Sequence, residues 1–592
     1  MGIASPFRLP RKTPFGLGEG VAEWATGLNK LDKFYAKRPA GIDTRGFLRF
    51  TLEVLGIDYQ ITQGTLSEVP TSGPTIVVAN HPLGCVEGVI LAELLLMLRS
   101  DVKILANQYL KTVPELDQLF IGVDVFEGKN AHQANLLALR EANRHLKQQG
   151  LLLLFPAGEV SKMVDSKTKK LEDKEWSRSV ASLVNKHQAT TVPVFIKGQN
   201  SRRFYLAGKV HPLLRTLMLG RELLNKQAQC IELFIGDAIK YKEISKLDDL
   251  KMVNYLRLNT YLLGQADHTL KHSQPSRSSN NATSDIAPRL PAQTLSDDIA
   301  HIPNDHHLLS HQEFDVYCTQ AKYIPALMHE IGRQRELNFR QVGEGTGKAL
   351  DLDLYDDDYH HLFIWDKDKQ QLVGAYRLGL VDTLLKRRGL DGLYSRTLFD
   401  YDQAFIDKMG HSIELGRSVI ASEYQKSMTA LLLLWKGIAT FVYKHPHYTH
   451  LYGPVSISND YSDSARQLLA QTLTLHHYDL ERAEHVKPIS PLGKQSQWNT
   501  NMLTALADIQ LLSKVISRLD QGRGVPVLLR QYLGLNGKLV SFNVDADFNH
   551  SLDGLILVDL TDVESKTLGR YMGNEQAKQY LNLHHNNQCA HG

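Results

Sequence analysis

A histidine followed closely by a glutamate gives this chain its clearest candidate for acid–base chemistry. The segment Asn80-His-Pro-Leu-Gly84 comes directly after an apolar run at residues 76–79, and Glu87 lies six residues beyond His81. A histidine takes the proton of an attacking hydroxyl when a carboxylate holds its other ring nitrogen and stabilises the imidazolium. For an isolated histidine, a structural role beside a helix start is the better interpretation, so the assignment depends on other segments.

Two further motifs agree with a chemical role. Phe155-Pro-Ala-Gly-Glu-Val-Ser161 ends a leucine-rich run in a tight turn, and residues 192–198 read Val-Pro-Val-Phe-Ile-Lys-Gly. In this order and over this separation, the three motifs resemble the glycerolipid (lysophospholipid) acyltransferase family. The resemblance covers about residues 45–265.

That resemblance implies transfer of an acyl chain from a thioester to a lipid hydroxyl. The donor is acyl-carrier protein or coenzyme A, and no other cofactor is implied. By the same resemblance His81 is the general base and Glu87 its orienting partner. The residues that it implies in substrate binding are Asn80, Gly84, Phe155, Pro156, Gly158 and Glu159.

The chain departs from this family in two ways. The family usually has four residues and then Asp after the histidine, whereas this chain has five residues and then Glu. The family also supplies an arginine for phosphate, whereas this chain offers Glu159, Asp124 and Glu127 with only Lys129. Such a site repels a phosphate dianion and favours an amine. The sequence therefore predicts an acceptor other than lysophosphatidate, unless these acids are ordinary solvated loop charges.

A second group of charged residues lies in the C-terminal half. It comprises Asp351-Leu-Asp353, the Arg377 of Val-Gly-Ala-Tyr-Arg-Leu, and Glu414-Leu-Gly-Arg417. Taken singly, a Glu-x-x-Arg at a strand end is more often a surface ion pair. As an ordered set with a late block at residues 532–555, these motifs resemble the ornithine N-acyltransferase family over about residues 315–570. That family is GNAT-like and distantly similar to acyl-homoserine-lactone synthases.

Amide formation requires a neutral amine, a thioester and a group that receives the proton. Glu414 is the candidate acceptor of the proton, and Arg377 and Arg417 are candidates for binding the amino acid's carboxylate. Asp351 and Asp353 are candidates for holding a second ammonium, such as that of ornithine. Because residues 417–431 contain no glycine-rich pyrophosphate loop, acyl-carrier protein is the favoured donor for this half. An apolar slot for the acyl chain is expected near residues 431–435, where a core helix is the simpler interpretation.

The elements that position these residues follow an α/β pattern in both halves. In the first, buried strands are predicted at residues 76–79, 103–106, 151–155 and 192–196, and a helix at residues 131–149 ends at Gly150. In the second, the patterns predict a hairpin within residues 361–378, strands at 412–415 and 451–457, and a helix at 427–443. We expect two α/β domains, one like glycerolipid acyltransferases and one GNAT-like.

A polar segment rich in Ser and Asn, followed by three prolines, divides the chain. It predicts a flexible linker at residues 268–310 between an O-acyltransferase domain at 1–267 and an N-acyltransferase domain at 311–592. The four cysteines show no paired spacing, so neither a disulfide framework nor a metal site is predicted. We read no signal peptide, and the apolar run at residues 88–98 is too short to span a membrane.

The charge is unevenly distributed along the chain. Residues 1–270 carry 35 Lys and Arg against 27 Asp and Glu, and the first fifty residues combine basic with apolar side chains. This pattern suits an anionic membrane surface, although a solvated charged face explains it equally well. No recognition motif for nucleic acid accompanies the charge. The expected location is the cytoplasm, peripheral on the inner face of the bacterial membrane.

The two halves together resemble a bifunctional ornithine-lipid synthase. The C-terminal half is expected to N-acylate an amino acid such as ornithine with a 3-hydroxyacyl chain, and the N-terminal half to O-acylate the resulting hydroxyl. The expected partners are acyl-carrier protein, membrane lipids and the amino acid. Two alternatives remain, a lysophospholipid acyltransferase with a regulatory GNAT-like half and a non-enzymatic, haemolysin-like membrane-binding protein.

Overall fold

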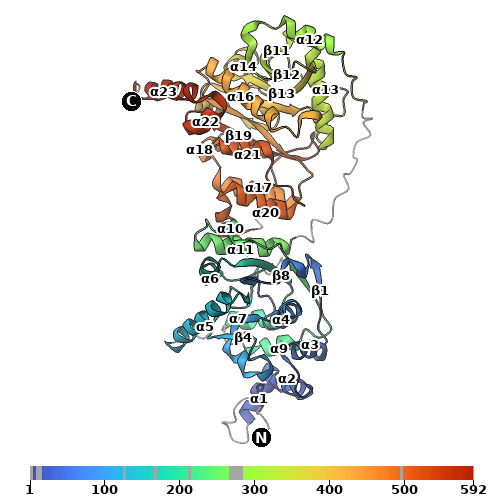
Figure 1. Ribbon diagram of the computed structural model, residues 1–592, viewed down its shortest axis with the longest axis vertical. Coiled ribbons are helices and arrows are strands. Elements are labelled where there is room, and N and C mark those ends of the chain that lie inside the picture. The colour runs from blue at the N-terminus through green and yellow to red at the C-terminus, as the bar shows by residue number, and fades with distance from the viewer. Residues whose placement is uncertain are drawn as a thin grey trace. The chain divides into compact units, whose positions relative to one another are not determined.

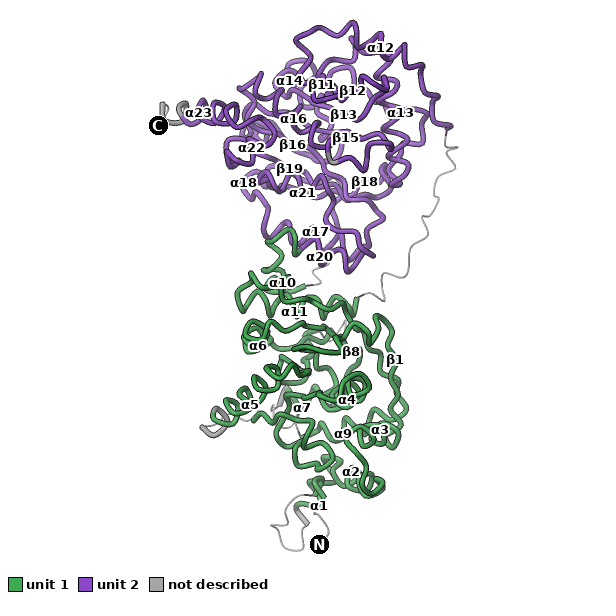
Figure 2. Tube along the Cα trace, viewed as in Figure 1, with its two compact units in different colours: residues 1–271, 498–511 green, residues 272–497, 512–592 purple. Residues whose placement is uncertain are grey.

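The structure is a computed structural model that describes residues 5–8, 17–124, 129–165, 170–210, 215, 217–265, 284–493 and 498–590. The chain forms two compact units (Figure 2). Unit 1 comprises residues 1–271 together with 498–511, and unit 2 comprises residues 272–497 and 512–592. Both units combine a central sheet with helices, which confirms the α/β fold class.

Unit 1 is built on a seven-stranded sheet in the order β1-β9-β8-β2-β5-β3-β4. Strands β1, β4 and β8 of this sheet are labelled in Figure 1. The strands are β1 (Asp58–Gln63), β2 (Thr75–Ala79), β3 (Val102–Asn107), β4 (Phe120–Val123), β5 (Leu151–Leu154), β8 (Thr190–Lys197) and β9 (Cys230–Ile235). A short hairpin of β6 (Lys162–Asp165) and β7 (Lys170–Glu172) stands apart from the sheet. Because β2 is parallel to its neighbours β5 and β8, the loops after these three strands leave the same edge of the sheet.

Helices and late residues of the chain complete unit 1. The helices are α1 (Leu17–Thr26), α2 (Leu28–Tyr35), α3 (Thr44–Leu55), α4 (Val86–Leu98), α5 (Lys129–Lys147), α6 (Ser179–His187), α7 (Arg202–Val210), α9 (Leu219–Leu224), α10 (Tyr241–Ile244) and α11 (Asp249–Leu263). The late elements α19 (Thr500–Leu503) and η11 (Thr504–Ala507) pack against α11, which also contacts β8 and α6. Helix α11 is consequently buried over most of its length.

Unit 2 contains an eight-stranded sheet in the order β10-β11-β12-β13-β15-β16-β19-β18. The strands are β10 (His307–His311), β11 (Phe314–Gln320), β12 (His360–Asp366), β13 (Gln371–Leu380), β15 (Ser412–Ile420), β16 (His450–Ile457), β18 (Lys538–Asp545) and β19 (Ser551–Asp559). All neighbours are antiparallel except β15 and β16. These two pair only from Ser412–His450 to Glu414–Tyr452, although both strands continue, so their backbones stop pairing just beyond Glu414.

The helices of unit 2 lie around this sheet. They are α12 (Ala292–His301), α13 (Pro325–Gln341), α14 (Val381–Arg388), α15 (Gln403–Met409), α16 (Met428–Lys444), α17 (Asp463–His476), α18 (Leu480–Ala483), α20 (Ile509–Leu519), α21 (Val527–Gly534), α22 (Ser565–Met572) and α23 (Asn574–Ala590). Strands β14 (Phe399–Tyr401) and β17 (Val486–Pro488) form a separate small pair. The short 3-10 helix η9 (Tyr394–Thr397) precedes β14 and borders the site described below.

The elements predicted from sequence patterns are present. The four strands of the first half correspond to β2, β3, β5 and β8, and the hairpin, strands and helix of the second half correspond to β12, β13, β15, β16 and α16. The helix predicted to end at Gly150 is α5, but Gln149 rather than Gly150 adopts the left-handed conformation there (φ 67°). The apolar run 88–98 lies in the buried helix α4. No helix in the described part of the chain is long and apolar enough to cross a membrane.

The segment expected to be a flexible linker differs from that expectation where it is described. Residues 266–283 lie outside the described residues. Residues 284–310 contain α12, and the buried Leu295 of this helix joins a core cluster with Ile324 and Leu327. Backbone N–H groups of Ser284 and Ala287 also donate to carbonyls at residues 347 and 349. One apolar helix face is therefore enough to order a stretch that composition alone assigns to a linker.

Candidate active sites

The loop after β2 brings His81 and Glu87 together. Nδ1 of His81 lies 2.9 Å from Oε1 of Glu87, and the same oxygen accepts hydrogen bonds from the backbone N–H groups of Leu83 (2.9 Å) and Gly84 (2.8 Å). The carboxylate is fully buried, whereas the imidazole keeps 17% of its side chain exposed. Glu87 stands one residue farther from the histidine than the family's Asp, and its side chain still reaches the ring nitrogen. This arrangement orients an imidazole whose other nitrogen is left for a reacting group.

The environment of Glu87 favours its charged form. Burial by itself raises the pKa of this carboxyl, but the nearby imidazole and the backbone N–H donors outweigh that effect and lower it below its usual value. A buried carboxylate that stays ionised stabilises an imidazolium formed beside it.

The turn after β5 packs against this loop. The Phe155 ring stacks on the His81 ring with centroids 4.5 Å apart, and Ser161 N–H donates to the His81 carbonyl (2.8 Å). The carbonyl of Pro156 accepts from Ser177 N–H, and Gly158 supplies a left-handed residue (φ 68°) and donates to Phe155 O. Asn80 bonds the backbone of Ile196 on β8 through both amide atoms, so its observed contacts tie two strands together.

Asp173, which follows β7, connects the loop of His81 to the turn after β5 through hydrogen bonds. Its carboxylate accepts from Ser161 Oγ (2.6 Å), Trp176 Nε1 (3.0 Å) and, at 3.3 Å, the backbone N–H of His81. Burial raises the pKa of Asp173. Sequence analysis missed this residue, and its only local signal was an acid three residues before a tryptophan.

The turn after β5 is not acidic as a whole, contrary to the sequence expectation. Glu159 lies within ion-pair distance of Arg215, Lys162 and Lys174, so cations outnumber it. Glu127 lies outside the described residues, and Asp124 follows β4, with its N–H donating to the Asn135 side chain. Glu159 therefore does not support an amine-bearing head group.

In unit 2, four predicted residues form one buried ion-pair network. Arg377 Nη1 lies 2.6 Å from Asp353, and Arg417 lies 3.2 Å from Asp351 and 3.5 Å from Asp353. Asp356, which was not singled out, accepts from Arg377 and from the fully buried Arg335 (2.8 Å). Asp351 and Asp353 are thus neutralised by arginines within the protein.

Glu414 is also buried, and its carboxylate accepts three hydrogen bonds. It accepts from the backbone N–H groups of Ser395 (2.7 Å) and Tyr394 (3.1 Å) and from the Tyr359 hydroxyl. These contacts hold η9, whose Tyr394 ring lies under both Arg377 and Arg417. These three donors fit a positioning role, because the carboxylate holds η9 and Tyr359 in place.

A second acidic group lies on the neighbouring strands. Glu344 accepts from Ser456 Oγ (2.9 Å), and Ser456 pairs across β16 and β19 with Asp553. Burial, and then the nearby charges of Asp545 and Glu344, raise the pKa of Asp553 well above its usual value. Carboxylates with raised pKa values suit proton acceptance near neutral pH. The late block at residues 532–555 contains Asp545 and Asp553, but the sequence alone does not indicate that they lie close to Glu344.

Arg417 occupies an unusual backbone position at the point where β15 and β16 stop pairing. Its φ is 49°, and the register between β13 and β15 shifts near it. A β-bulge of this kind redirects side chains and is frequent beside active sites. It turns the Arg417 side chain toward Asp351, Tyr394 and Phe548.

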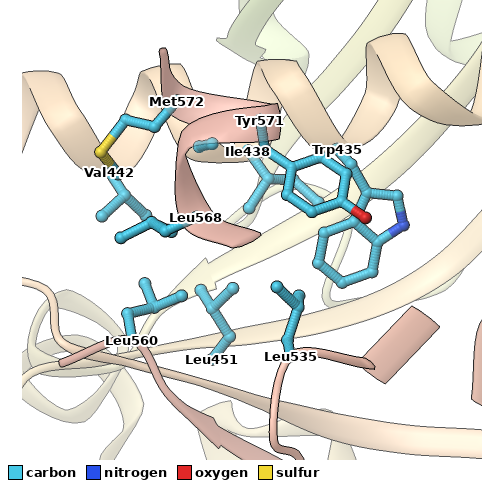
Figure 3. Close-up of a pocket in the computed structure, with 10 residues that line it drawn as sticks. Trp435, Ile438, Val442, Leu451, Leu535, Leu560, Leu568, Tyr571 and Met572 are labelled. Atoms are coloured by element: carbon cyan, nitrogen blue, oxygen red, sulfur yellow. The ribbon is translucent and has the colours of Figure 1, made fainter. Parts of the chain in front are cut away.

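An apolar pocket lies between the sheet and helices α16 and α22 (Figure 3). In the figure, Leu451, Leu535 and Leu560 point toward side chains of the two helices. Leu451 pairs with Ile413 and Tyr452 with Glu414, so the pocket and the Glu414 side chain lie on opposite faces of the sheet. The pocket is lined by Trp435, Ile438, Ala439, Val442, Leu451, Leu535, Leu560, Leu568, Tyr571 and Met572. Of residues 431–435, where the slot was expected, only Trp435 lines this pocket, and Leu433 and Leu434 are buried in the core as the simpler interpretation predicted.

Known proteins and family models resemble both halves. Residues 30–269 match the family described as acyltransferase, and residues 334–436 match the acetyltransferase (GNAT) domain. A glycine N(alpha)-acyltransferase of Phocaeicola vulgatus is 28% identical over 257 residues, which cover 40% of this chain and 76% of that protein. A lyso-glycine lipid O-acyltransferase of the same organism is 25% identical over 218 residues, covering 36% and 74%.

A solved structure is also similar to part of the chain. The 1-acyl-sn-glycerophosphate acyltransferase of Thermotoga maritima is 16% identical with a TM-score of 0.26, covering 42% of this chain and 89% of that one. The family matches and the named relatives do not agree with the non-enzymatic alternative. The chain is an acyltransferase enzyme that carries an N-terminal acyltransferase domain and a C-terminal GNAT domain.

Proposed function

We propose that this enzyme makes a diacylated aminolipid in two steps. Unit 2 transfers a 3-hydroxyacyl chain from acyl-carrier protein to the α-amine of an amino acid, and unit 1 esterifies the new hydroxyl with a second chain. The names of two relatives describe an N-acylation and an O-acylation of this kind. The observation that carries the proposal is the His81–Glu87 pair of unit 1 on the same chain as a GNAT domain.

In unit 1, the chemistry follows from the orientation of His81. With Nδ1 at Glu87, Nε2 is the nitrogen that takes the proton from the acceptor hydroxyl. The hydroxyl oxygen then forms a bond to the thioester carbonyl carbon, the C–S bond breaks, and the leaving thiolate regains the proton from the imidazolium. No covalent enzyme intermediate is required.

In unit 2, we propose that the amine loses its proton to whichever carboxylate of the Glu344 and Asp553 group is ionised, directly or through water. Glu414 instead positions Tyr394 beneath Arg417. The apolar pocket next to Trp435 supports binding of the acyl chain, because its lining carries no charged side chain.

The amino acid is proposed to be small, with glycine favoured over ornithine. Asp351 and Asp353, the candidates for a second ammonium group, are already paired with Arg417 and Arg377. The two relatives that act on glycine compounds point in the same direction. Ornithine is the second candidate, and the same assay distinguishes the two by product mass.

We also propose that the enzyme works peripherally on the inner face of the bacterial membrane. Val21 and Trp24 on α1 are 66% and 69% exposed, near the basic residues of the first fifty positions. Apolar and basic side chains together favour an anionic lipid surface.

The test is lipid mass spectrometry after expression in a host that lacks aminolipids. The wild-type chain is expected to give a phosphorus-free lipid with one amide and one ester chain. His81→Ala is expected to leave the mono-acylated amide, because unit 2 still acts. Arg417→Ala is expected to remove both species, because it disrupts the ion-pair network with Asp351 and Asp353 in unit 2.

His187→Ala is the matched control, since this histidine of α6 bonds Asn143 away from the motifs and its variant is expected to give the wild-type profile. If wild type produces no new lipid, or if His81→Ala gives the same diacylated lipid as wild type, the proposed function is wrong.

A further inference from the structure

Three basic side chains surround Glu159 on the turn after β5. Arg215 Nη2 lies 2.5 Å from Glu159 Oε2, Lys162 Nζ lies 3.0 Å from Oε1, and Lys174 Nζ lies 3.9 Å from Oε1. Three cations around one carboxylate leave an excess of positive charge. None of the three lies in the motifs that resemble the glycerolipid acyltransferase family.

Arg215 is built into the unit rather than displayed on its surface. Its side chain is only 11% exposed, whereas those of Lys162 and Lys174 are 54% and 65% exposed. A Cβ at Gly208 on α7 would lie 3.1 Å from Arg215 Cδ, so the aliphatic part of the arginine is closely packed. Packing fixes the guanidinium in place, which lowers the entropic cost of holding a bound anion.

Chain neighbours of this basic group pack against the loop that carries the proposed general base. A Cβ at Gly84 would lie 2.5 Å from Leu219 Cδ2 and 3.4 Å from Val160 Cγ2, so the loop of His81 packs closely against both side chains. Val160 directly follows Glu159, and Leu219 lies four residues after Arg215. The turn that carries Glu159 and the segment that follows Arg215 therefore both pack against the loop of His81.

We propose that Arg215, assisted by Lys162 and Lys174, recognises the free carboxylate of the lipid acceptor, an N-(3-hydroxyacyl) amino acid. This inference rests on the proposed function. N-acylation removes the charge of the α-amine. The carboxylate is then the charged head group that an O-acyltransferase can bind. A planar guanidinium matches a carboxylate in shape and charge.

The retained Glu159 tunes this site for a monoanion. Its charge offsets part of the cation field and disfavours a phosphate dianion more than a carboxylate. Arg215 thus supplies the arginine that is missing from the turn at residues 155–161.

The test compares two acceptors that differ in a single group. Full-length enzyme is assayed for O-acylation of a long-chain N-(3-hydroxyacyl)glycine and of the corresponding glycinamide, which has no carboxylate. We expect wild type to prefer the carboxylate at least tenfold in kcat/KM. Arg215→Gln is expected to lose that preference by raising KM for the carboxylate acceptor, with little change for the amide.

Two variants keep this test interpretable. Lys162→Gln combined with Lys174→Gln changes only exposed side chains and is expected to shift the preference in the same direction by a smaller factor. Lys251→Gln removes an exposed ion pair with Asp248 at the start of α11 and is expected to leave the preference unchanged. Retained O-acylation of the amide acceptor by Arg215→Gln verifies that unit 1 of the variant is folded.

The outcomes separate this inference from the proposed function. If wild type acylates neither acceptor, the proposed function fails. If wild type acylates both and Arg215→Gln discriminates as wild type does, the inference fails and the proposed function stands. Faster acylation of lysophosphatidate than of the carboxylate acceptor overturns the assignment of a carboxylate to this site.

Discussion

At the scale of single residues, the O-acylation site depends on how firmly the loop of His81 is held. Asp173 joins three segments through hydrogen bonds to Ser161, Trp176 and the His81 backbone. An asparagine at this position keeps one acceptor oxygen but loses the second. The role of Asp173 is therefore one of positioning.

We expect Asp173→Asn to lower kcat for O-acylation about tenfold or more with little change in KM, because a small displacement of a base impairs proton transfer. Ser161→Ala removes the hydroxyl that donates to Asp173. Because both substitutions affect this hydrogen bond, their effects should be strongly non-additive, with a coupling of about 0.5–3 kcal/mol. Kinetics of the two single variants and the double variant measure this coupling. Simple additivity would mean that the contact does not position His81.

The raised pKa of Asp553 should make the stability of the folded chain depend on pH. Its raised pKa means that the folded chain keeps a proton that the unfolded chain, with a carboxyl pKa of about 3.9, has lost. The folded state then binds more protons, so its stability falls as pH rises above about 4 and through the folded pKa. Asn at this position carries no such charge.

Asp553→Asn is therefore expected to become more stable than wild type as pH rises from about 4.5 to 8, with the smallest difference at the acid end. Urea midpoints of the unit 2 transition across this range provide the measurement. A constant difference at every pH would show that Asp553 is not protonated preferentially in the folded state.

At the scale of elements, Gly84 is the point where the loop between β2 and α4 is most constrained. Its φ is 101°, a conformation that L side chains rarely adopt, and a Cβ there would lie 2.5 Å from Leu219. Its N–H also donates to Glu87, so any backbone adjustment moves the carboxylate that orients His81.

Gly84→Ala is expected to reduce O-acylation more than tenfold while N-acylation by unit 2 stays near wild type. Gly73→Ala is the matched control, because Gly73 has a similar φ of 84° but nothing within 4 Å of its Cβ position. It should cost only about 1–2 kcal/mol of left-handed strain, without loss of activity. Equal losses of activity in both variants would remove the argument for a steric constraint at Gly84.

At the scale of the whole molecule, the two units do not correspond to two uninterrupted stretches of chain. Residues 498–511 belong to unit 1 and place Met502, Leu503 and Leu506 in buried positions, in elements that pack on α11. Burying a large apolar side chain contributes about 1.5–3 kcal/mol each. This late segment is therefore part of the stability of unit 1.

Leu506→Asp in the full chain is expected to lower the temperature at which O-acylation is lost, because it places a charge in an apolar contact. N-acylation should survive to its usual temperature. Leu480→Asp, at a position that is 75% exposed, is the control and should change neither. Parallel loss of both activities in Leu506→Asp would indicate that the segment does not stabilise unit 1 selectively.

The sequence by itself determined which elements form and which residue types stand at the strand ends. Apolar runs and helical periodicity depend on local spacing, so β2, β5, β15 and α16 were predictable from them. The motif around His81 was equally local, and together with the later motifs it indicated the chemistry before any contact was known.

Only the tertiary structure decided which charges meet. The pairing of Arg417 with Asp351, the hydrogen bonds from η9 to Glu414, and the pairing of Arg215 with Glu159 join residues that are distant in the chain. The same holds for residues 498–511, which lie more than two hundred residues beyond the rest of unit 1. Electrostatic and packing energies depend on distance in space, and a single sequence gives distance only along the chain.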